Sequence, residues 1–344
     1  MALSGGPAES PWPGACRGLE ALTPTQDGSP GLLAAAAWPH LLTWNGDGWA
    51  VAPLPGDRTG RAPAGSPPPC VAADWDGDGY VDVLQLRDAE GLLWRGQKGG
   101  FAEPVACPAG SGGSPARWCV GDFDTDGKPD LFVSGSESCQ LWENEGRDSF
   151  RPVIHYAGSL DYRTEPGAAD CLATDLNHDG RPDVALLYGK GHFLYHFNRG
   201  YRCMAEEGQL TLDLDPSGGD PSKAGGPACA TAGDVNADGS LDLAVAFDSG
   251  EVRCFLNDRR DQPGLWIRLP RGRTGPVTVS VWQGQPRAFC VGTHLVAGHA
   301  PPTCVPLRRP GPCVLRWRWP GGQPLELTAN PGDELILPWH GAHD

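Results

Sequence analysis

Four nine-residue stretches place oxygen-bearing side chains at positions 1, 3, 5 and 9 and a glycine at position 6; they begin at Asp74, Asp122, Asp175 and Asp234. So many oxygen donors in a short segment repel one another unless a hard cation lies among them. Ca²⁺ suits such a set because it accepts about six to eight oxygens in flexible geometry, whereas Mg²⁺ demands a tighter octahedron. The spacing therefore predicts four Ca²⁺ sites.

In each stretch we expect the side chains at positions 1, 3, 5 and 9 to bind the ion, together with the main-chain carbonyl of residue 7. The predicted ligand residues are Asp74, Asp76, Asp78, Tyr80 and Asp82; Asp122, Asp124, Asp126, Lys128 and Asp130; Asp175, Asn177, Asp179, Arg181 and Asp183; and Asp234, Asn236, Asp238, Ser240 and Asp242. The glycine at position 6 permits the sharp backbone reversal that curls the loop round the ion.

The first five positions also match an EF-hand loop, which needs a bidentate Glu at position 12 and a helix on either side. Position 12 holds Gln85, Val133, Leu186 and Val245 in the four stretches. Each stretch also runs into a short apolar segment that is typical of a buried strand. The stretches are therefore predicted to be loops between strands. One alone could be an ordinary acidic turn, but four in register argue against that.

The four stretches belong to a longer repeat. A degenerate copy at 23–31 keeps one carboxylate, Asp27, and the glycine, so we expect it to bind no ion; the five copies start at residues 23, 74, 122, 175 and 234. A period near fifty residues, with room for four short strands, indicates the blade of a β-propeller. Each copy also has an aromatic-containing strand, and we expect its aromatic side chain to pack between blades rather than to form a glycan-stacking platform. These aromatics are Trp44, Trp94, Trp142, Tyr195 and Phe255.

After residue 257 the repeat stops, and alternating strands such as 276–281 and 314–319 follow, the latter running into a Pro-Gly-Gly turn at 320–322. The predicted fold is all-β: a β-propeller of short four-stranded blades, with five repeats visible, followed by a small C-terminal β domain. The predicted boundaries are a flexible lead-in at 1–16, the propeller with its Ca²⁺ loops at 17–263, the β domain at 264–338 and a tail at 339–344.

Charge and cysteine content limit the possible partners. The chain has 344 residues and a net charge of −15, which four bound Ca²⁺ would roughly halve, and it has no basic cluster that suggests nucleic acid. Twelve cysteines, an even number without the paired spacing of zinc sites, suit an oxidising compartment. Whether they form disulfides stays open, because several fall on strands where a buried free thiol packs equally well.

Targeting signals are not evident. No segment reaches the ~20 apolar residues that span a bilayer, and the N-terminus lacks a basic region followed by an apolar core. The chain is then a mature form, a fragment or a cytosolic protein. Cytosolic Ca²⁺ is too scarce to fill weak sites, which favours the first two. We therefore expect an extracellular or cell-surface location.

The loop motif, its following strand and the turn after Asn144 or Asn198 resemble the FG-GAP or VCBS repeats of integrin α-subunit propellers, over roughly residues 17–260. This resemblance implies that each loop is a hairpin closing over Ca²⁺ on one face of the propeller. Such propellers usually have seven blades, whereas five are visible here. Three explanations of this difference stay open. The five blades close into a ring alone, further blades are too diverged in sequence to be seen, or an N-terminal part of the propeller is missing.

The segment 264–338 resembles the ASPIC/UnbV domain that follows VCBS repeats in the cartilage acidic protein family. The resemblance rests on Trp266-Ile267-Arg268-Leu269 and on residues 314–322. Residues 292–306 depart from the usual serine- and glycine-rich pattern of that family, so a ligand role there is not carried over.

These features predict a calcium-stabilised, non-catalytic binding or adhesion module whose partner is an unknown extracellular protein or glycan. Catalytic signatures such as G-x-S-x-G and H-E-x-x-H are missing. Two alternatives stay open. One is a structural subunit that assembles into a homo-oligomer or fibre of the cell surface or extracellular space; the other is a propeller enzyme acting on polysaccharides.

Overall fold

The computed structural model describes the chain from residue 16 to residue 338 with internal gaps. The residues outside the description are 1–15, 23–30, 45–46, 57–66, 114–115, 147, 154–166, 178, 190–191, 201–203, 212–225, 237, 239, 258–263, 271–276, 285–288, 297–302, 308 and 339–344. Every regular element among the described residues is a strand, which confirms the all-β prediction. The degenerate copy at 23–31 lies almost wholly outside the described residues.

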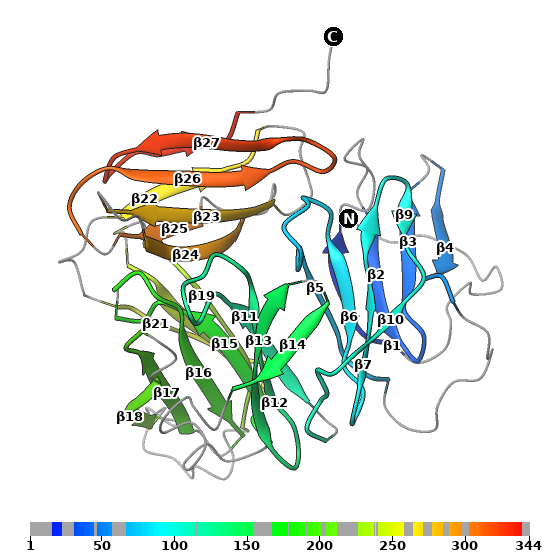
Figure 1. The fold of residues 1–344 in the computed structure, drawn as a ribbon. Coiled ribbons are helices and arrows are strands. Elements are labelled where there is room, and N and C mark those ends of the chain that lie inside the picture. Colours follow the sequence, from blue (N-terminus) through cyan, green and yellow to red (C-terminus); the bar gives the residue numbers. More distant parts are fainter. Residues whose placement is uncertain are drawn as a thin grey trace.

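Five antiparallel sheets follow one another along the chain and form the blades of the propeller (Figure 1). Their strands are β1 (Cys16–Leu22), β2 (Gly31–Ala36), β3 (His40–Trp44) and β4 (Trp49–Pro53) in blade 1; β5 (Cys70–Ala73), β6 (Asp82–Gln85), β7 (Gly91–Trp94) and β10 (Val105–Cys107) in blade 2; β11 (Arg117–Gly121), β12 (Asp130–Ser134), β13 (Cys139–Gly146) and β14 (Ser149–Pro152) in blade 3; β15 (Asp170–Thr174), β16 (Asp183–Tyr188), β17 (His192–Asn198) and β18 (Met204–Thr211) in blade 4; and β19 (Pro227–Gly233), β20 (Asp242–Phe247) and β21 (Val252–Phe255) in blade 5. A small hairpin, β8 (Gly96–Gln97) and β9 (Gly100–Phe101), extends blade 2.

The second strand of blades 2, 3 and 4 is buried on both faces because a blade packs against it from either side. All residues of β6, β12 and β16 are buried, which explains why these strands read as continuous apolar runs rather than as alternating ones. Four hydrophobic clusters fill the spaces between consecutive blades from blade 1 to blade 5. An edge-to-face pair in the cluster between blades 2 and 3, Trp75 with Phe150, has ring centroids 5.3 Å apart.

The predicted aromatic positions divide in two. Trp94 and Trp142 lie buried in the clusters between blades, and Tyr195 and Phe255 pack against the cluster between blades 4 and 5. The prediction is wrong for Trp44, which is 48% exposed and packs edge-on against Trp49 of the neighbouring strand. The reason is its position at the tip of the β3–β4 hairpin, beyond the reach of blade 2.

The C-terminal residues form a separate sandwich of two sheets. One sheet has the order β25 (Thr303–Pro306), β22 (Gly264–Arg268), β28 (Glu334–Ile336), and the other has the order β24 (Phe289–Val296), β23 (Val277–Gln283), β26 (Cys313–Arg318), β27 (Pro324–Ala329). Their facing side chains make a core of their own that includes Ile267, Val279, Leu315 and Trp317. We call residues 264–338 the C-terminal domain.

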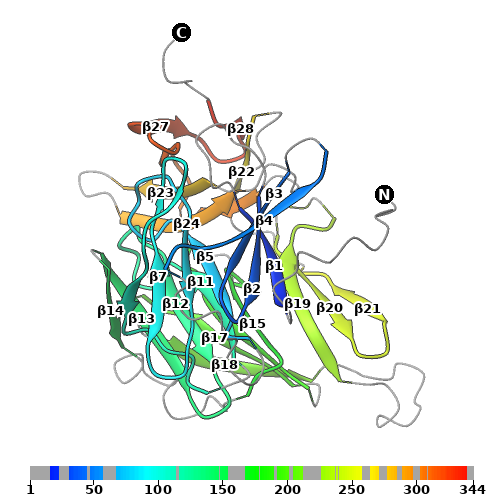
Figure 2. The ribbon, with the colours of Figure 1, turned by 90° about the vertical axis from the view of Figure 1, so that its right-hand side faces the viewer.

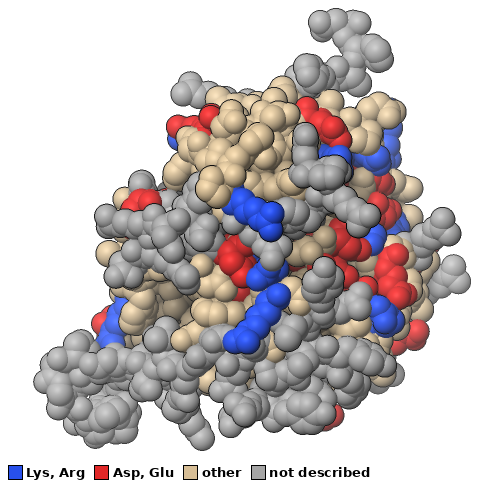
Figure 3. All heavy atoms as spheres, turned by 60° about the vertical axis from the view of Figure 1, so that its left-hand side comes forward, with Lys and Arg blue, Asp and Glu red and all other residues tan. Residues whose placement is uncertain are grey.

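The C-terminal domain lies across one end of the propeller in both orthogonal views (Figures 1 and 2). The connections between the first and second strands of blades 2 to 5 reach this same end. On the face shown in Figure 3, acidic and basic side chains are interspersed rather than gathered into one basic area.

Candidate cation-binding loops

All four Asp-rich stretches are loops that join the first and second strands of blades 2 to 5. They span residues 74–82, 122–130, 175–183 and 234–242, and we call them the blade 2, 3, 4 and 5 loops. Position 9 of each loop is also the first residue of the second strand. The same fold therefore places all four predicted ligand sets at one end of the propeller.

The aspartate at position 9 fastens each loop to its blade. In the blade 3 loop, Asp130 accepts hydrogen bonds from the main-chain N–H of Phe123 at 3.0 Å and of Asn144 at 2.8 Å. Equivalent pairs of bonds, all between 2.8 and 3.0 Å, reach Asp82, Asp183 and Asp242. Because all four carboxylates are at most 2% exposed, each bonds amides that would otherwise be buried without a partner.

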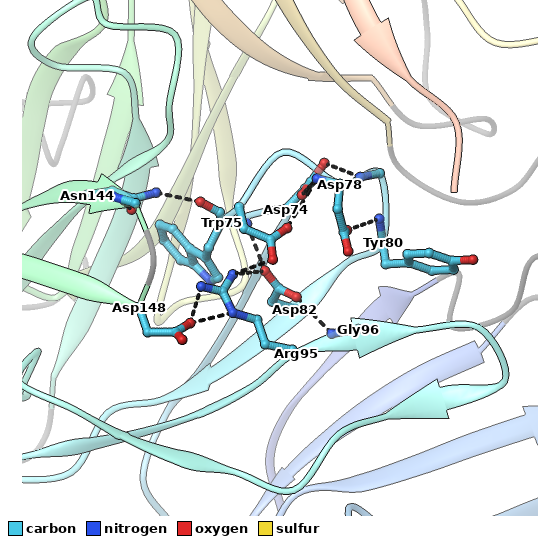
Figure 4. A network of polar contacts seen from close by, with 12 residues as sticks. Asp74, Trp75, Asp78, Tyr80, Asp82, Arg95, Gly96, Asn144 and Asp148 are labelled. Atoms are coloured by element: carbon cyan, nitrogen blue, oxygen red, sulfur yellow. Dashed lines mark hydrogen bonds and ion pairs between the residues drawn. The ribbon is translucent and has the colours of Figure 1, made fainter. Parts of the chain in front are cut away.

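The side chains at positions 1, 3 and 5 turn inward because main-chain amides hold them. In the blade 2 loop, the Asp74 carboxylate accepts hydrogen bonds from the N–H groups of Asp78 and Gly79. The N–H of Asp78 also donates to Asp76, and the N–H of Tyr80 donates to Asp78 (Figure 4). All four bonds are 2.8–3.1 Å long. The blade 3 and blade 4 loops repeat this pattern bond for bond. The blade 5 loop repeats it over its described residues.

This arrangement brings carboxylate oxygens together tightly enough for one ion. In the blade 2 loop, ligand atoms of Asp74, Asp76 and Asp78 all lie within 4.8 Å of one another, and Asp122, Asp124 and Asp130 do the same in the blade 3 loop. In the blade 4 and blade 5 loops an Asn takes position 3, so the set holds one carboxylate fewer. Such oxygen-only sets suit a hard divalent cation.

Burial without a cation makes these carboxylates hard to ionise. Burial, together with the nearby charges of Asp78 and Asp76, raises the pKa of Asp74 to about 7. Burial raises the pKa of Asp82 to about 8 despite the opposing effects of the Gly96 N–H and of Arg95. The pKa of Asp183 in the blade 4 loop is likewise raised to about 8 by burial. A bound cation would remove this penalty by compensating the charge.

The residues at position 7 lie where the sequence predicts them, and their carbonyl ligation stays a prediction. Each donates its main-chain N–H to position 5. Tyr80, Arg181 and Ser240 are buried. The side chains of Lys128 and Arg181 also pair with the aspartate at position 5 of their own loop, a contact that the sequence analysis did not foresee.

The backbone reversal involves two left-handed residues rather than the glycine at position 6 alone. Gly79, Gly127 and Gly180 at position 6 have φ of 92°, 91° and 85°, and position 4 is left-handed as well, with φ of 72° at Gly77 and 62° at Thr125. Glycine adopts such angles without steric cost, whereas a β-branched residue does not. Thr125 is therefore strained.

Replacing Thr125 by asparagine is expected to raise the free energy of unfolding by about 0.5–1 kcal/mol, because asparagine tolerates the left-handed region far better. Chemical denaturation of cation-free protein measures the gain. Thr125→Val, which keeps the β-branch, is the matched control and should give none. A Thr125→Asn protein no more stable than the wild type would show that the Thr125 backbone is not strained.

Sequence reasoning also missed Arg95, which comes from the end of β7 and enters the blade 2 loop. Its Nη1 lies 2.9 Å from Asp82 and 3.2 Å from Asp76, and the guanidinium also binds Asp148 of blade 3 (Figure 4). Asp76 and Asp82 are predicted ligands, so Arg95 competes for their oxygens. At the equivalent place blades 3, 4 and 5 carry Glu143, Phe197 and Leu256. Because no basic residue recurs there, the repeat pattern did not single out Arg95.

Arg95→Gln is expected to tighten cation binding by the blade 2 loop about tenfold, a change of about 1.4 kcal/mol, since two ligand carboxylates lose a competing cation. Calorimetric titration should show the weakest binding step strengthening while the others stay unchanged. Lys128→Gln serves as control, because Lys128 pairs with one aspartate only and is 41% exposed. An unchanged isotherm for Arg95→Gln would show that Arg95 does not compete.

Three asparagines link the blade 2, 3 and 4 loops, one each, to the next blade. Asn144 donates to the carbonyl of Trp75 at 2.8 Å, Asn198 to that of Phe123 at 2.8 Å, and Asn257 to that of Leu176 at 3.3 Å. In each case the acceptor is position 2 of the preceding blade's loop. The detectable signal was the recurrence of Asn 14 or 15 residues after position 9. Loop conformation is thereby coupled to the packing of neighbouring blades.

The comparisons with known proteins agree with this geometry. The FG-GAP-like repeat family matches residues 74–133 and 122–186. Integrin alpha-IIb of Mus musculus is 32% identical over 158 residues, and integrin alpha-IIb of Homo sapiens is 30% identical over 177 residues. These alignments cover 40% and 44% of this chain but only 15% and 16% of the two integrins.

Among solved structures, a lectin of Agrocybe aegerita that recognises non-reducing terminal N-acetylglucosamine has a TM-score of 0.50 at 15% identity, covering 93% of this chain and 87% of the lectin. That likeness concerns the fold alone. The chain thus carries FG-GAP-like repeats related to those of integrin alpha-IIb, as the loops predict. The ASPIC/UnbV resemblance of the C-terminal domain stays a prediction. None of the described residues forms a helix long and apolar enough to cross a membrane.

Proposed function

We propose that this chain is a non-catalytic binding or adhesion module of the extracellular space or the cell surface, in which each of the four loops holds a Ca²⁺ ion. The observation that carries the proposal is the hydrogen-bond scheme that the loops share, which brings ligand atoms of three carboxylates within 4.8 Å of one another in the blade 2 and blade 3 loops and recurs over the described residues of the blade 4 and blade 5 loops. The relationship to integrin alpha-IIb repeats supports the adhesion role.

In this proposal the cation stabilises the fold and the partner, an extracellular protein or a glycan, binds elsewhere. Each ion binds the carboxylates of one loop, which repel one another when no ion is bound. The asparagine hydrogen bonds then couple the ordered loop to the next blade. The C-terminal domain is proposed to be of the ASPIC/UnbV type, on the strength of its opening Trp266-Ile267-Arg268-Leu269 and of residues 314–322.

Thermal unfolding of cation-free protein, with and without about 1 mM Ca²⁺, tests the proposal together with metal counting on the desalted protein. A site at about 100-fold its dissociation constant contributes about 2.7 kcal/mol, so several filled sites should raise Tm by about 10 °C or more. We expect four ions, the one in the blade 2 loop the weakest. No bound Ca²⁺ and no rise in Tm would refute the cation sites.

Self-assembly is a second candidate that one observation favours. Val252 and Leu256 lie on one face at the end of blade 5 and are 63% and 62% exposed. Among the described strands none pairs with the outer edge of β21. Sedimentation of wild type against Val252→Glu with Leu256→Glu tests this candidate, because self-association through the blade 5 face should be lost in the double variant.

A further inference from the structure

The C-terminal domain rests on the loops themselves. At Gly79, position 6 of the blade 2 loop, a Cβ would lie 2.8 Å from the carbonyl carbon and oxygen of Trp319 and 3.0 Å from the nitrogen of Pro320. At Gly127, the same position of the blade 3 loop, it would lie 2.9 Å from the Cζ2 atom of Trp282. Two loops therefore touch the C-terminal domain where a side chain has no room.

Cys304 of β25 lies within electrostatic range of the other two loops. Its neighbour Val305 points into the domain core, so Cys304, on the opposite face of the strand, points away from that core. The thiol is only 5% exposed, and its pKa is raised to about 12 by burial and by the charges of Asp234, Asp175 and Asp238. The C-terminal domain thus lies against the blade 2 and blade 3 loops and brings Cys304 within electrostatic range of the blade 4 and blade 5 loops.

Apolar packing does not account for this docking. Among the described residues, each hydrophobic cluster lies either between consecutive blades or inside the C-terminal domain, and none includes buried residues of both. What the C-terminal domain lies against instead is a surface of clustered carboxylates, of which Asp74 and Asp122 are buried. Covering anions with protein is unfavourable unless their charge is compensated.

We propose that the loop-bearing end of the propeller is a docking surface for the C-terminal domain and that cations in the loops are required for docking. This inference rests on the cation sites proposed above. With cations bound, the loops are neutralised and fixed in the shape that fits Trp282 and the turn after Trp319. Without them, the carboxylates repel one another under a low-dielectric cover, and the domain separates from the propeller.

A consequence concerns partner binding. While the C-terminal domain is docked, the parts of the blade 2 and blade 3 loops around Gly79 and Gly127 are not open to an external partner of the calcium-loaded protein. Loss of cations uncovers the loop end. A fall in cation concentration is therefore converted into the exposure of a new surface.

Thiol labelling of the full chain, read by peptide mass spectrometry, tests the proposal. Cys304 lies at the interface, whereas Cys313 lies in the core of the C-terminal domain and is 1% exposed. Removing Ca²⁺ should speed labelling of Cys304 at least about tenfold and leave Cys313 protected. Labelling of both thiols together would mean that the domain unfolds, which would overturn the inference.

Two glycines of the blade 2 loop provide a matched pair of variants. Gly79→Ala places a methyl group against the Trp319 backbone, whereas Gly77→Ala has the same left-handed strain with nothing within 4 Å of the new Cβ. In saturating Ca²⁺, Gly79→Ala should expose Cys304 to labelling, while Gly77→Ala reports the effect of left-handed strain alone and should expose Cys304 much less.

Metal counting on the same samples separates the two proposals. Absence of bound cations overturns the proposed function, and the docking inference with it. Cations bound but Cys304 equally protected with and without Ca²⁺ overturns the docking inference alone. Equal labelling of Cys304 in Gly79→Ala and Gly77→Ala would also contradict the proposed docking of the C-terminal domain on the blade 2 loop.

Discussion

Asp130→Ala is expected to lower the free energy of unfolding by about 2–6 kcal/mol in cation-free buffer, and by more in Ca²⁺. The reason is that Asp130 accepts two buried main-chain N–H groups, those of Phe123 and Asn144, and each would be left without a partner at a cost of about 1–3 kcal/mol. In Ca²⁺ the loss should be larger still, because a ligand disappears as well. Chemical denaturation in the two buffers measures both losses.

Asp124→Ala is the contrasting variant in the same loop. Asp124 accepts the exposed N–H of Asp126, and that N–H also bonds to Asp122. In cation-free buffer its removal should change the free energy of unfolding by less than about 0.5 kcal/mol, since it also relieves repulsion among the carboxylates. In Ca²⁺ it should remove much of the stabilisation that the blade 3 ion supplies. Equal losses in both buffers would contradict a role through the ion.

These two aspartates also show what the sequence could reveal. Spacing identified both as candidate ligands, because the alternation of oxygen donors is a local property. It could not separate Asp130, whose position 9 is also the start of a buried strand, from Asp124 at the loop surface. That difference depends on β13, whose Asn144 amide arrives from 14 residues further along the chain.

The architecture was more predictable than the contacts between its parts. A repeat near fifty residues and apolar runs after each loop predicted blades, because a strand covered on both faces needs apolar residues throughout. No local pattern places Arg95 beside Asp76 and Asp82, or Trp282 over Gly127. Such contacts depend on how blades and the C-terminal domain pack together, and neither periodicity nor residue type encodes that directly.

Nine of the cysteines, which the sequence left open between disulfides and buried thiols, form no disulfide in the structure; they are Cys70, Cys107, Cys119, Cys139, Cys171, Cys229, Cys254, Cys304 and Cys313. Cys70, Cys119 and Cys171 are buried on the first strands of blades 2, 3 and 4. They pack there as small apolar side chains, as free cysteine commonly does. The even number of cysteines thus gave no guide to pairing among these nine residues.

The stability of the cation-free protein is expected to fall as pH rises from about 5 to 8.5. In the folded state the pKa values of Asp74, Asp82 and Asp183 are raised to about 7, 8 and 8, whereas in the unfolded chain they lie near 3.9. Between these values the folded state binds more protons than the unfolded chain. The resulting stabilisation is fully present below about pH 4 and is lost as pH rises through the folded values.

Saturating Ca²⁺ should remove or reverse this trend, because the ion replaces the protons and binds more tightly as the carboxylates ionise. Tm measured from pH 5.5 to 8.5 in chelator-treated buffer and in Ca²⁺ gives both slopes, and titration in unbuffered solution at pH 7 should detect protons released on binding. Asp183→Asn removes one titrating group and should flatten the cation-free slope by at most about 1.4 kcal/mol per pH unit. A cation-free Tm that rises with pH would show that these carboxylates are already ionised and compensated without a cation, and the case for cations as the compensating charge would fail.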